Sequence, residues 1–273
     1  MRSFEGRCVV ITGAAGGLGA ALVRAFRRVG AHVVALDRDA PALGALQREE
    51  SRHPGEAALP WLSAVCDVTD FAACEAAMAQ TIARFGGIDV LVNNAGISHR
   101  SAFTKTRVSV LRQVMEVNFF GAVHCTRAAI DSLRARRGMI IAISSVAGFA
   151  PLIGRTGYAA SKHASHGFFD SLRTEVESDG VSVLMVCPSF INTGIDRAAL
   201  GPDGRAAPQA RKATGTPAQP AQVAAAILDA ARAEQRLLLF GATSKAAWWL
   251  SRLWPARYAA MMKRRLRTEI FPE

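Results

Sequence analysis

The sequence predicts an α/β fold in which one mostly parallel sheet carries helices on both faces. Short apolar, β-branched runs recur along the chain, and each is followed by a longer Ala-, Leu- and Arg-rich stretch with helical periodicity. The apolar runs do not alternate with polar residues, which is typical of strands that are buried on both faces. A glycine-rich turn joins the first run to its helix, as in doubly wound sheets.

The length and composition fit one folded domain over residues 1–273. Half of the residues are apolar and a fifth are charged, which excludes a globally disordered chain. No repeat or linker divides the sequence, and a chain of this size buries a large core without disulfides or metals. The five cysteines form no Cys-x-x-Cys pair, so we expect reduced, buried thiols, no metal site and a cytoplasmic setting.

The expected strands are separated by longer stretches with helical periodicity. They are Cys8–Ile11, His32–Leu36, a run ending before Cys66, Val90–Val92, Met139–Ile143 and Val181–Val186. The first run is too short for a signal peptide, and no run reaches the roughly 18 apolar residues of a membrane-spanning helix. Residues 200–220 hold four prolines and three glycines, which predicts a loop. It is either a flap over the substrate site or a surface insertion.

A glycine-rich loop follows the first strand, with the sequence Thr12-Gly13-Ala14-Ala15-Gly16-Gly17-Leu18-Gly19. Gly13 can form the tight turn, Gly17 can admit a pyrophosphate close to the backbone, and Gly19 can let the next helix pack against the sheet. The N–H groups at the start of that helix are suited to phosphate oxygens. In this context the loop predicts a dinucleotide site.

The end of the second strand indicates which dinucleotide is bound. Asp37 is placed to accept hydrogen bonds from ribose hydroxyls and to repel a 2′-phosphate, which favours NAD. The neighbouring Arg38 is suited to clasp a 2′-phosphate, which favours NADP. Because Ala14, Ala15 and Gly16 add no basic group, we favour NAD.

Several motifs together resemble the compact type of the short-chain dehydrogenase/reductase family. They are the Thr-Gly-x-x-x-Gly-x-Gly loop at 12–19, Asn-Asn-Ala-Gly at 93–96, Tyr158 four residues before Lys162, and Ser145 thirteen residues before Tyr158. The resemblance implies a Rossmann-type domain of about seven strands that oligomerises, as a dimer or tetramer, through two long helices. It also implies an oxidoreductase that uses a nicotinamide cofactor.

The candidate catalytic residues are Asn118, Ser145, Tyr158 and Lys162. On a helix, Tyr158 and Lys162 share one face, where the positive charge favours the phenolate form of the tyrosine. The resemblance makes Tyr158 the acid/base, Lys162 its partner and a ribose ligand, and Ser145 the donor to the substrate oxygen. Ser144 is the alternative to Ser145, and only the spacing argues against it. Asn118 matches a residue that holds a water in a proton relay, although it can also be an ordinary helix residue.

The resemblance also assigns residues to the cofactor. Asp67 and Val68 bracket the adenine, although Asp67 or Thr69 can equally cap a helix that starts near Asp70. Ser189 stands where the family usually has glycine, so the backbone after Pro188 can differ. The whole cofactor set is Gly13, Gly16, Gly17, Leu18, Gly19, Asp37, Arg38, Asp67, Val68, Asn94, Ala95, Gly96, Tyr158, Lys162, Pro188, Ile191 and Thr193.

Apolar residues near the reacting centre predict a hydrophobic secondary alcohol or ketone as substrate. They are Ala147, Phe149, Leu152, Ile153, Phe190 and Ile195. Arg155 and His99 are the nearby polar exceptions. Either can meet a carboxylate or another acceptor, but we favour the interpretation of both as solvated loop residues. A nucleotide-sensing regulator without catalysis is a rival function, but it predicts a damaged Ser-Tyr-Lys set, and here the set is intact.

The net charge of +11 points to acidic partners until its distribution is considered. From Gly241 onward, seven basic residues face two acidic ones, so the tail alone holds a net +5. No basic stripe crosses the rest of the chain, so we expect no nucleic-acid partner. Residues 242–268 predict a basic amphipathic helical tail, with Tyr258, Met261, Met262 and Leu266 on one stripe. It either lies on an anionic membrane or packs on the body over the substrate entrance, and we favour packing.

Overall fold

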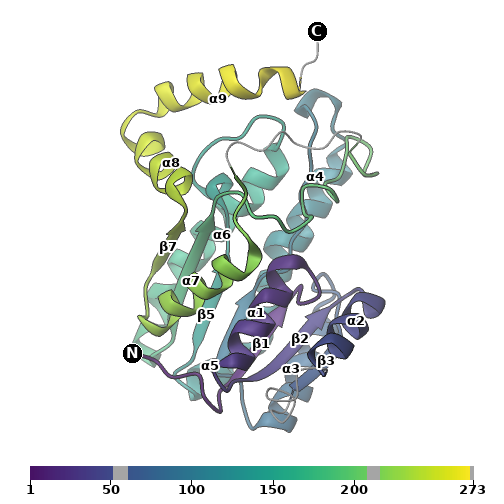
Figure 1. Cartoon of the computed structure of the whole chain (residues 1–273), viewed down its shortest axis with the longest axis vertical. Helices are drawn as coiled ribbons and strands as arrows, with labels where there is room; N and C mark the ends of the chain where they lie inside the picture. The colour runs from purple at the N-terminus through teal and green to yellow at the C-terminus, as the bar shows by residue number, and fades with distance from the viewer. Residues whose placement is uncertain (52–60, 208–215, 271–273) are drawn as a thin grey trace.

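The protein folds around one seven-stranded parallel sheet with helices on both faces, which confirms the predicted fold class (Figure 1). The computed structural model describes residues 1–51, 61–207 and 216–270, with side chains up to residue 264. The strand order is β3-β2-β1-β4-β5-β6-β7. The strands are β1 (Cys8–Thr12), β2 (His32–Asp37), β3 (Trp61–Val65), β4 (Val90–Asn93), β5 (Met139–Ile143), β6 (Ser182–Pro188) and β7 (Leu237–Phe240).

The helices alternate with the strands along most of the chain. They are α1 (Gly17–Arg28), α2 (Ala40–Glu50), α3 (Phe71–Phe85), α4 (Val108–Met115), α5 (Gly121–Ala135), α6 (Thr156–Val176), α7 (Pro220–Arg232), α8 (Ala242–Leu253) and α9 (Pro255–Ile270). A π-helical turn, η2 (Glu116–Phe120), joins α4 to α5. A short 3-10 helix, η3 (Val146–Gly148), follows β5. None of the described helices is long and apolar enough to cross a membrane.

Both faces of the sheet are buried, which explains why the strand sequences do not alternate. Val9 and Ile11 of β1 pack with α1, α2 and α7, whereas Cys8 and Val10 pack with α3, α5 and α6. Burial of apolar surface on both sides is the main stabilising contribution to such a sheet. All five cysteines are buried free thiols, as expected.

The start of α3 differs from the prediction. Asp70 is the N-cap, because its carboxylate accepts hydrogen bonds from the N–H groups of Ala72 and Ala73. Asp67 and Thr69 therefore do not cap this helix. Instead, Asp67 accepts from the N–H and the hydroxyl of Thr69, and these hydrogen bonds lower the pKa of the Asp67 carboxyl.

The last two helices extend beyond the sheet. After β7 the chain forms α8, turns at Trp254 and Pro255, and continues as α9 across the end of the molecule (Figure 1). The predicted tail is therefore two helices rather than one. The side chain of Leu266, assigned to the apolar stripe, lies outside the described residues.

Candidate active site

One cavity of about 1030 Å³ opens along the carboxyl ends of the central strands. The carboxyl edge of an open parallel sheet is where ligands bind in doubly wound folds. Every residue assigned to the cofactor or to catalysis lines this cavity, apart from Asn118, which is buried beside it. The structure thus brings together side chains that lie up to 180 residues apart, from Gly13 to Thr193.

The glycine loop is shaped by close backbone approaches. Gly13 has a φ of +61°, and a Cβ atom there would lie 2.8 Å from the Cα of Ala95. A Cβ on Gly19 would lie 2.1 Å from the carbonyl oxygen of Gly13, so only glycine lets α1 start this close to the turn. A Cβ on Gly17 would lie 2.9 Å from the Cα of Thr193, which belongs to the segment after β6.

Asn94 and Thr12 hold this loop against the end of β4. The side-chain amide of Asn94 donates to the carbonyl oxygens of Thr12 and Gly13, at 2.9 and 3.0 Å. The hydroxyl oxygen of Thr12 accepts from the N–H groups of Asn94 and Ala95. These four hydrogen bonds tie the ends of the adjacent strands β1 and β4 together.

Asp37 and Arg38 lie at the other end of the cavity. The carboxylate of Asp37 accepts from the N–H of Ala15, at 2.9 Å, and from the N–H of Asp39, at 3.0 Å. Both of its oxygens are thus oriented by backbone groups, which fixes the carboxylate beside the glycine loop. Arg38 lines the same region of the cavity, so the structure does not choose between the two dinucleotides.

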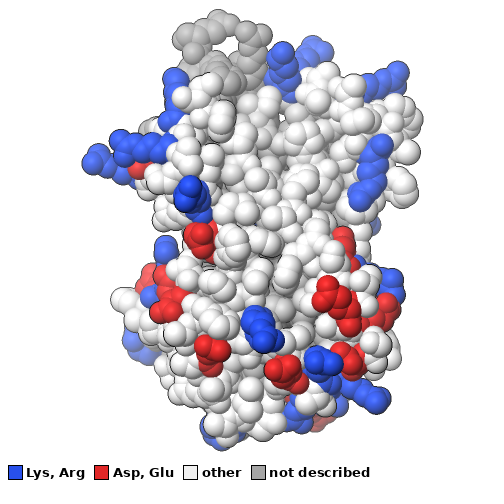
Figure 2. Space-filling view, turned by 180° about the vertical axis from the view of Figure 1, so that it is seen from behind, with Lys and Arg blue, Asp and Glu red and all other residues white. Residues whose placement is uncertain are grey.

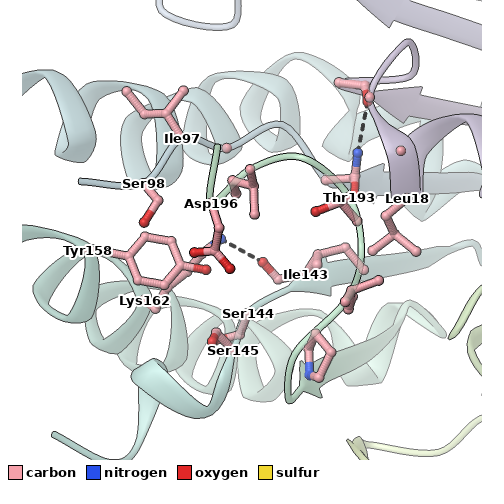
Figure 3. Close-up of a pocket in the computed structure, with 18 of the residues that line it drawn as sticks. Leu18, Ile97, Ser98, Ile143, Ser144, Ser145, Tyr158, Lys162, Thr193 and Asp196 are labelled. Atoms are coloured by element: carbon pink, nitrogen blue, oxygen red, sulfur yellow. Dashed lines mark hydrogen bonds between the residues drawn. The ribbon is translucent and has the colours of Figure 1, made fainter. Parts of the chain in front are cut away.

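Tyr158 and Lys162 lie one turn apart on α6 and face the cavity (Figure 3). The ammonium nitrogen of Lys162 lies 5.8 Å from the centre of the Tyr158 ring and donates to the carbonyl oxygen of Ile143, at 2.8 Å. Burial lowers the pKa of Lys162 to about 8. The carbonyl of Ile143 fixes the ammonium group at the carboxyl end of β5, beside the tyrosine.

Ser145 and Ser144, the two candidates for the substrate donor, have different surroundings. The oxygen of Ser145 accepts from the N–H of Ala147, at 3.2 Å, and its own O–H bonds no described residue. The side chain is half-buried at the cavity wall, where Figure 3 shows it near Tyr158. Ser144 is 3% exposed, and its hydroxyl fills the space that Gly148 leaves open.

Asn118 lies in the π-helical turn η2, not in a regular α-helix. Its amide donates to the carbonyl oxygen of Ile97 and to the hydroxyl of Ser161, and its oxygen accepts from the N–H of Ile97. Ser161 stands next to Lys162 on α6, so Asn118 joins the chain after β4 to the helix that carries the reacting groups. π-Helical turns occur frequently at functional sites.

His99 and Arg155 are buried, so the interpretation of both as solvated loop residues is wrong. His99 accepts a hydrogen bond at Nε2 from the N–H of Gly157, at 2.8 Å. The guanidinium of Arg155 bonds the Ser98 hydroxyl and forms an ion pair with Asp196, at 2.6 Å. Their partners are 41 to 58 residues away in sequence, and local sequence carries no signal of such contacts.

The segment after β6 closes one side of the cavity. Its lining residues lie between Pro188 and Ala198 and include Ile191, Thr193 and Asp196. The described residues of 200–220 do not line the cavity, and 208–215 lie outside the described residues. A flap over 200–220 stays a prediction, while the observed cover is the preceding segment.

A family model described as short chain dehydrogenase matches residues 7–201, well over half of the chain. The chain belongs to the short-chain dehydrogenase/reductase family. Family membership makes this protein an oxidoreductase by class, in agreement with the motifs.

Curated relatives agree over nearly the whole length. A dehydrogenase/reductase SDR family member 7B from Bos taurus is 38% identical and covers 98% of this chain and 84% of its own. A dehydrogenase/reductase SDR family protein 7-like from Anopheles gambiae is 37% identical and covers 97% and 84%. This chain is similar to both along the body and the tail.

Solved structures of short-chain dehydrogenases share the fold. A short-chain dehydrogenase from Streptomyces avermitilis superposes with a TM-score of 0.79 at 28% identity, covering 96% of this chain and 98% of its own. A family member from Burkholderia phymatum, in complex with NAD, has a TM-score of 0.79 at 24% identity and covers 92% and 95%.

The cavity wall of this short-chain dehydrogenase/reductase includes residues that the sequence did not predict. Of the predicted apolar set, Leu152, Phe190 and Ile195 line the cavity, whereas Ala147, Phe149 and Ile153 do not. The missed wall comes from α8 and α9. Its larger residues are Leu250, Tyr258, Met261 and Met262. The sequence feature that indicates this wall is the apolar stripe of Tyr258, Met261 and Met262, which favours packing of the tail on the body.

Proposed function

We propose that this protein catalyses reversible hydride transfer between a nicotinamide cofactor and a hydrophobic secondary alcohol or ketone, with Tyr158 as the acid/base. One observation carries the proposal. A single cavity joins the glycine loop and Asp37 to the side chains of Ser145, Tyr158 and Lys162, so a ligand seated on the loop reaches the reacting groups.

The shape of the cavity fits a dinucleotide. Side chains at Gly13, Gly17 or Gly19 would collide with neighbouring backbone, so glycine keeps the loop compact. The N-terminus of α1 faces the cavity and has no acidic residue in its first turn. Such a helix end favours phosphate oxygens. Asp37 would bind the ribose hydroxyls at the adenine end, and Lys162 those at the nicotinamide end. When bound, the nicotinamide cofactor supplies the hydride acceptor or donor.

The residues of the chain position the substrate and move its proton. Ser145 donates to the substrate oxygen and holds it against the phenol of Tyr158. In oxidation Tyr158 removes the hydroxyl proton, and in reduction it returns one. The ammonium of Lys162 stabilises the phenolate form, because an opposite charge nearby favours ionisation. Asn118 keeps α6 in register with the chain after β4, which sets the position of both groups.

NAD is the favoured cofactor. The support is the carboxylate of Asp37, which two backbone N–H groups hold at the adenine end of the cavity, where it would repel a 2′-phosphate. Titration with NADH and NADPH tests this choice, with Asp37→Ser as the variant that removes the repulsion. We expect tighter binding of NADH, and a gain for NADPH in Asp37→Ser. Tighter binding of NADPH by the unaltered protein would contradict the choice and assign Arg38 to the phosphate.

The acid/base role is tested with Tyr158→Phe on a panel of secondary alcohols and ketones. Loss of general acid–base catalysis lowers turnover by about a hundredfold or more, while NADH binding, followed by its fluorescence, stays unchanged. Unchanged turnover in the variant would overturn the role of Tyr158. Binding of NADH with no turnover of any panel substrate, in the unaltered protein as in the variant, would instead favour a nucleotide sensor.

We also propose that the protein assembles as a homodimer or homotetramer through α4, α5 and α6. Phe120, the last residue of η2, is 41% exposed, although it packs edge-on against Phe119, which in turn contacts Phe168 of α6. An aromatic cluster that continues to the surface of these helices suits burial against a second subunit. Sedimentation velocity of the protein and of Phe120→Ser measures the assembly.

A further inference from the structure

Helix α8 and the bend that follows it expose three large apolar side chains, which we call the tail edge. They are Trp249, Leu253 and Trp254, with exposed fractions of 60%, 57% and 49%. Trp249 and Leu253 lie one turn apart on the same face of α8, and Trp254 follows at the bend before α9. Three such side chains in one short segment form an exposed apolar patch. A patch of this kind is typical of an interaction site.

Packing of the tail on the body does not involve the tail edge. Ala247 and Tyr258 are buried against Val146 and Ala150, and this contact fixes the opposite face of the helices. Trp248 also turns inward, where its ring meets Phe149 edge-on at 4.9 Å. The favoured interpretation of the tail therefore holds for one face of α8 and α9, and a second face is left over.

The two helices that flank the tail edge carry exposed basic residues and no acidic residue up to residue 264. Lys245, Arg252, Arg257, Lys263 and Arg264 are all exposed, and residues 241–264 contain neither Asp nor Glu. None of the ion pairs between described residues involves these five cations. Figure 2 shows Lys and Arg without acidic neighbours at the upper right of the molecule, whereas both signs are mixed over the lower half.

We propose that α8 and α9 bind an anionic membrane surface, with Trp249, Leu253 and Trp254 inserted at the level of the lipid headgroups. Tryptophan suits that boundary because its ring is apolar and its N–H is polar. The surrounding cations suit acidic headgroups. A second copy of this chain is a poor occupant, since its own net charge is +11 and its tail carries the same sign.

This placement gives the cavity a wall next to the lipid. Leu250 faces the cavity from α8, the helix that exposes Trp249 and Leu253 on its other side, and Met261 and Met262 face the cavity from α9. An apolar substrate dissolved in the membrane then has a short route to the reacting groups. The surface stands on the exposed residues and their charges alone, so it does not depend on the reaction proposed above.

The test is co-sedimentation of the full chain with vesicles of phosphatidylcholine, with and without phosphatidylserine. We expect binding that requires phosphatidylserine and weakens at high salt. Replacing all three edge residues (Trp249→Ser, Leu253→Ser and Trp254→Ser) should abolish binding. Each of Lys245→Gln and Arg257→Gln, which remove one positive charge, should lower the partition coefficient by about fivefold. Quenching of tryptophan fluorescence by bromolipids should disappear in Trp249→Phe/Trp254→Phe, although Trp61 and Trp248 remain.

The control replaces an exposed apolar and basic pair on α3, Ile82→Ser with Arg84→Glu, and should bind vesicles like the unaltered protein. All variants retain the circular dichroism spectrum and the thermal unfolding midpoint of the unaltered protein if they are folded, which separates loss of the surface from loss of the fold. No vesicle binding by the unaltered protein would overturn the proposal. So would self-association that the triple variant abolishes in the absence of lipid, because the occupant would then be a second copy.

Discussion

The imidazole of His99 accepts a hydrogen bond at Nε2 from the backbone N–H of Gly157, 2.8 Å away and one residue before Tyr158. Arg155, the N-cap residue of α6, forms no side-chain hydrogen bond to the N–H groups of the first turn. His99 thus acts as a remote cap for the helix that carries the reacting tyrosine. It is a positioning residue, since it acts on the backbone of α6.

Removing this acceptor should misplace Tyr158. We expect His99→Ala to lower kcat by about tenfold, because small displacements of a reacting group have large effects on rate. His99→Gln should restore most of the rate, since a glutamine oxygen can accept the same hydrogen bond. Steady-state kinetics measures the effect on kcat, and titration with NADH measures the effect on cofactor binding. The Kd for NADH should not change. Equal rates for the Ala and Gln variants would contradict the positioning role.

His99 also makes stability depend on pH. Burial, with a smaller effect from the nearby Arg155, lowers the pKa of His99 to about 4, below its usual 6.5. The unfolded chain therefore binds the proton first, and stability falls as the pH drops from 6.5 towards 4. From pH 7 to pH 5 the free energy of unfolding in urea should fall in both proteins. The fall should be about 1–2 kcal/mol smaller in His99→Gln than in the unaltered protein.

The matched control for that pH experiment is His163→Gln, on the exposed side of α6. It should show the same pH-dependent loss as the unaltered protein. If His99→Gln also shows the full loss, the buried histidine is not responsible for it. His166 is a second source to measure in the same way, because burial lowers its pKa to about 4 as well.

The contact between Gly17 and Thr193 should control cofactor affinity. In Gly17→Ala the new methyl group would lie 2.9 Å from the Cα of Thr193, so the segment after β6 must move away from the glycine loop. We expect the Kd for NADH, measured by calorimetry, to rise by about tenfold, the equivalent of 1.4 kcal/mol. Gly167→Ala is the control, because that exposed position in α6 has open space and should gain about 0.5–1 kcal/mol of stability.

The ion pair between Arg155 and Asp196 should hold the cover of the cavity in place. Asp196→Asn removes the charge opposite a guanidinium that is 8% exposed. One third of the Asp196 side chain is exposed to solvent, which weakens the ion pair. We therefore expect the substitution to lower the free energy of unfolding in urea by only about 1–2 kcal/mol. Asp203→Asn, at an exposed pair with Arg205, should leave the unfolding curve unchanged. An unchanged curve for Asp196→Asn would mean that the pair does not stabilise the fold.

Much of the fold was predictable because its determinants are local. The apolar runs at Cys8–Ile11 and Met139–Ile143 correspond to strands within a residue, since burial on both faces requires continuous apolar sequence. The glycine loop was equally clear, because its glycine spacing is local: Gly19 closely approaches the carbonyl oxygen of Gly13, six residues earlier, and Gly13 has a positive φ. The cap of α3 was misassigned because Asp67, Thr69 and Asp70 have similar capping ability, and only the geometry distinguishes them.

The site was less predictable where its contacts are distant in sequence. Arg155 and His99 have the composition of loop residues, and only their partners at Asp196 and Gly157 explain their burial. The cavity wall from α8 and α9 likewise depends on how the tail folds back after β7. The apolar stripe predicted a packed face, but not which cavity it would line.

The π-helical turn at Asn118 makes the length of this helix as important as its sequence. Deleting one residue from Glu116–Phe120 would restore regular α-helical pitch and rotate one flank against the other by about 100°. Asn118 would then lose its hydrogen bonds to either Ile97 or Ser161. The flanks cannot turn to compensate, because α4 packs against α6 while α5 packs against α3. Insertions and deletions here should therefore be tolerated less well than most single substitutions.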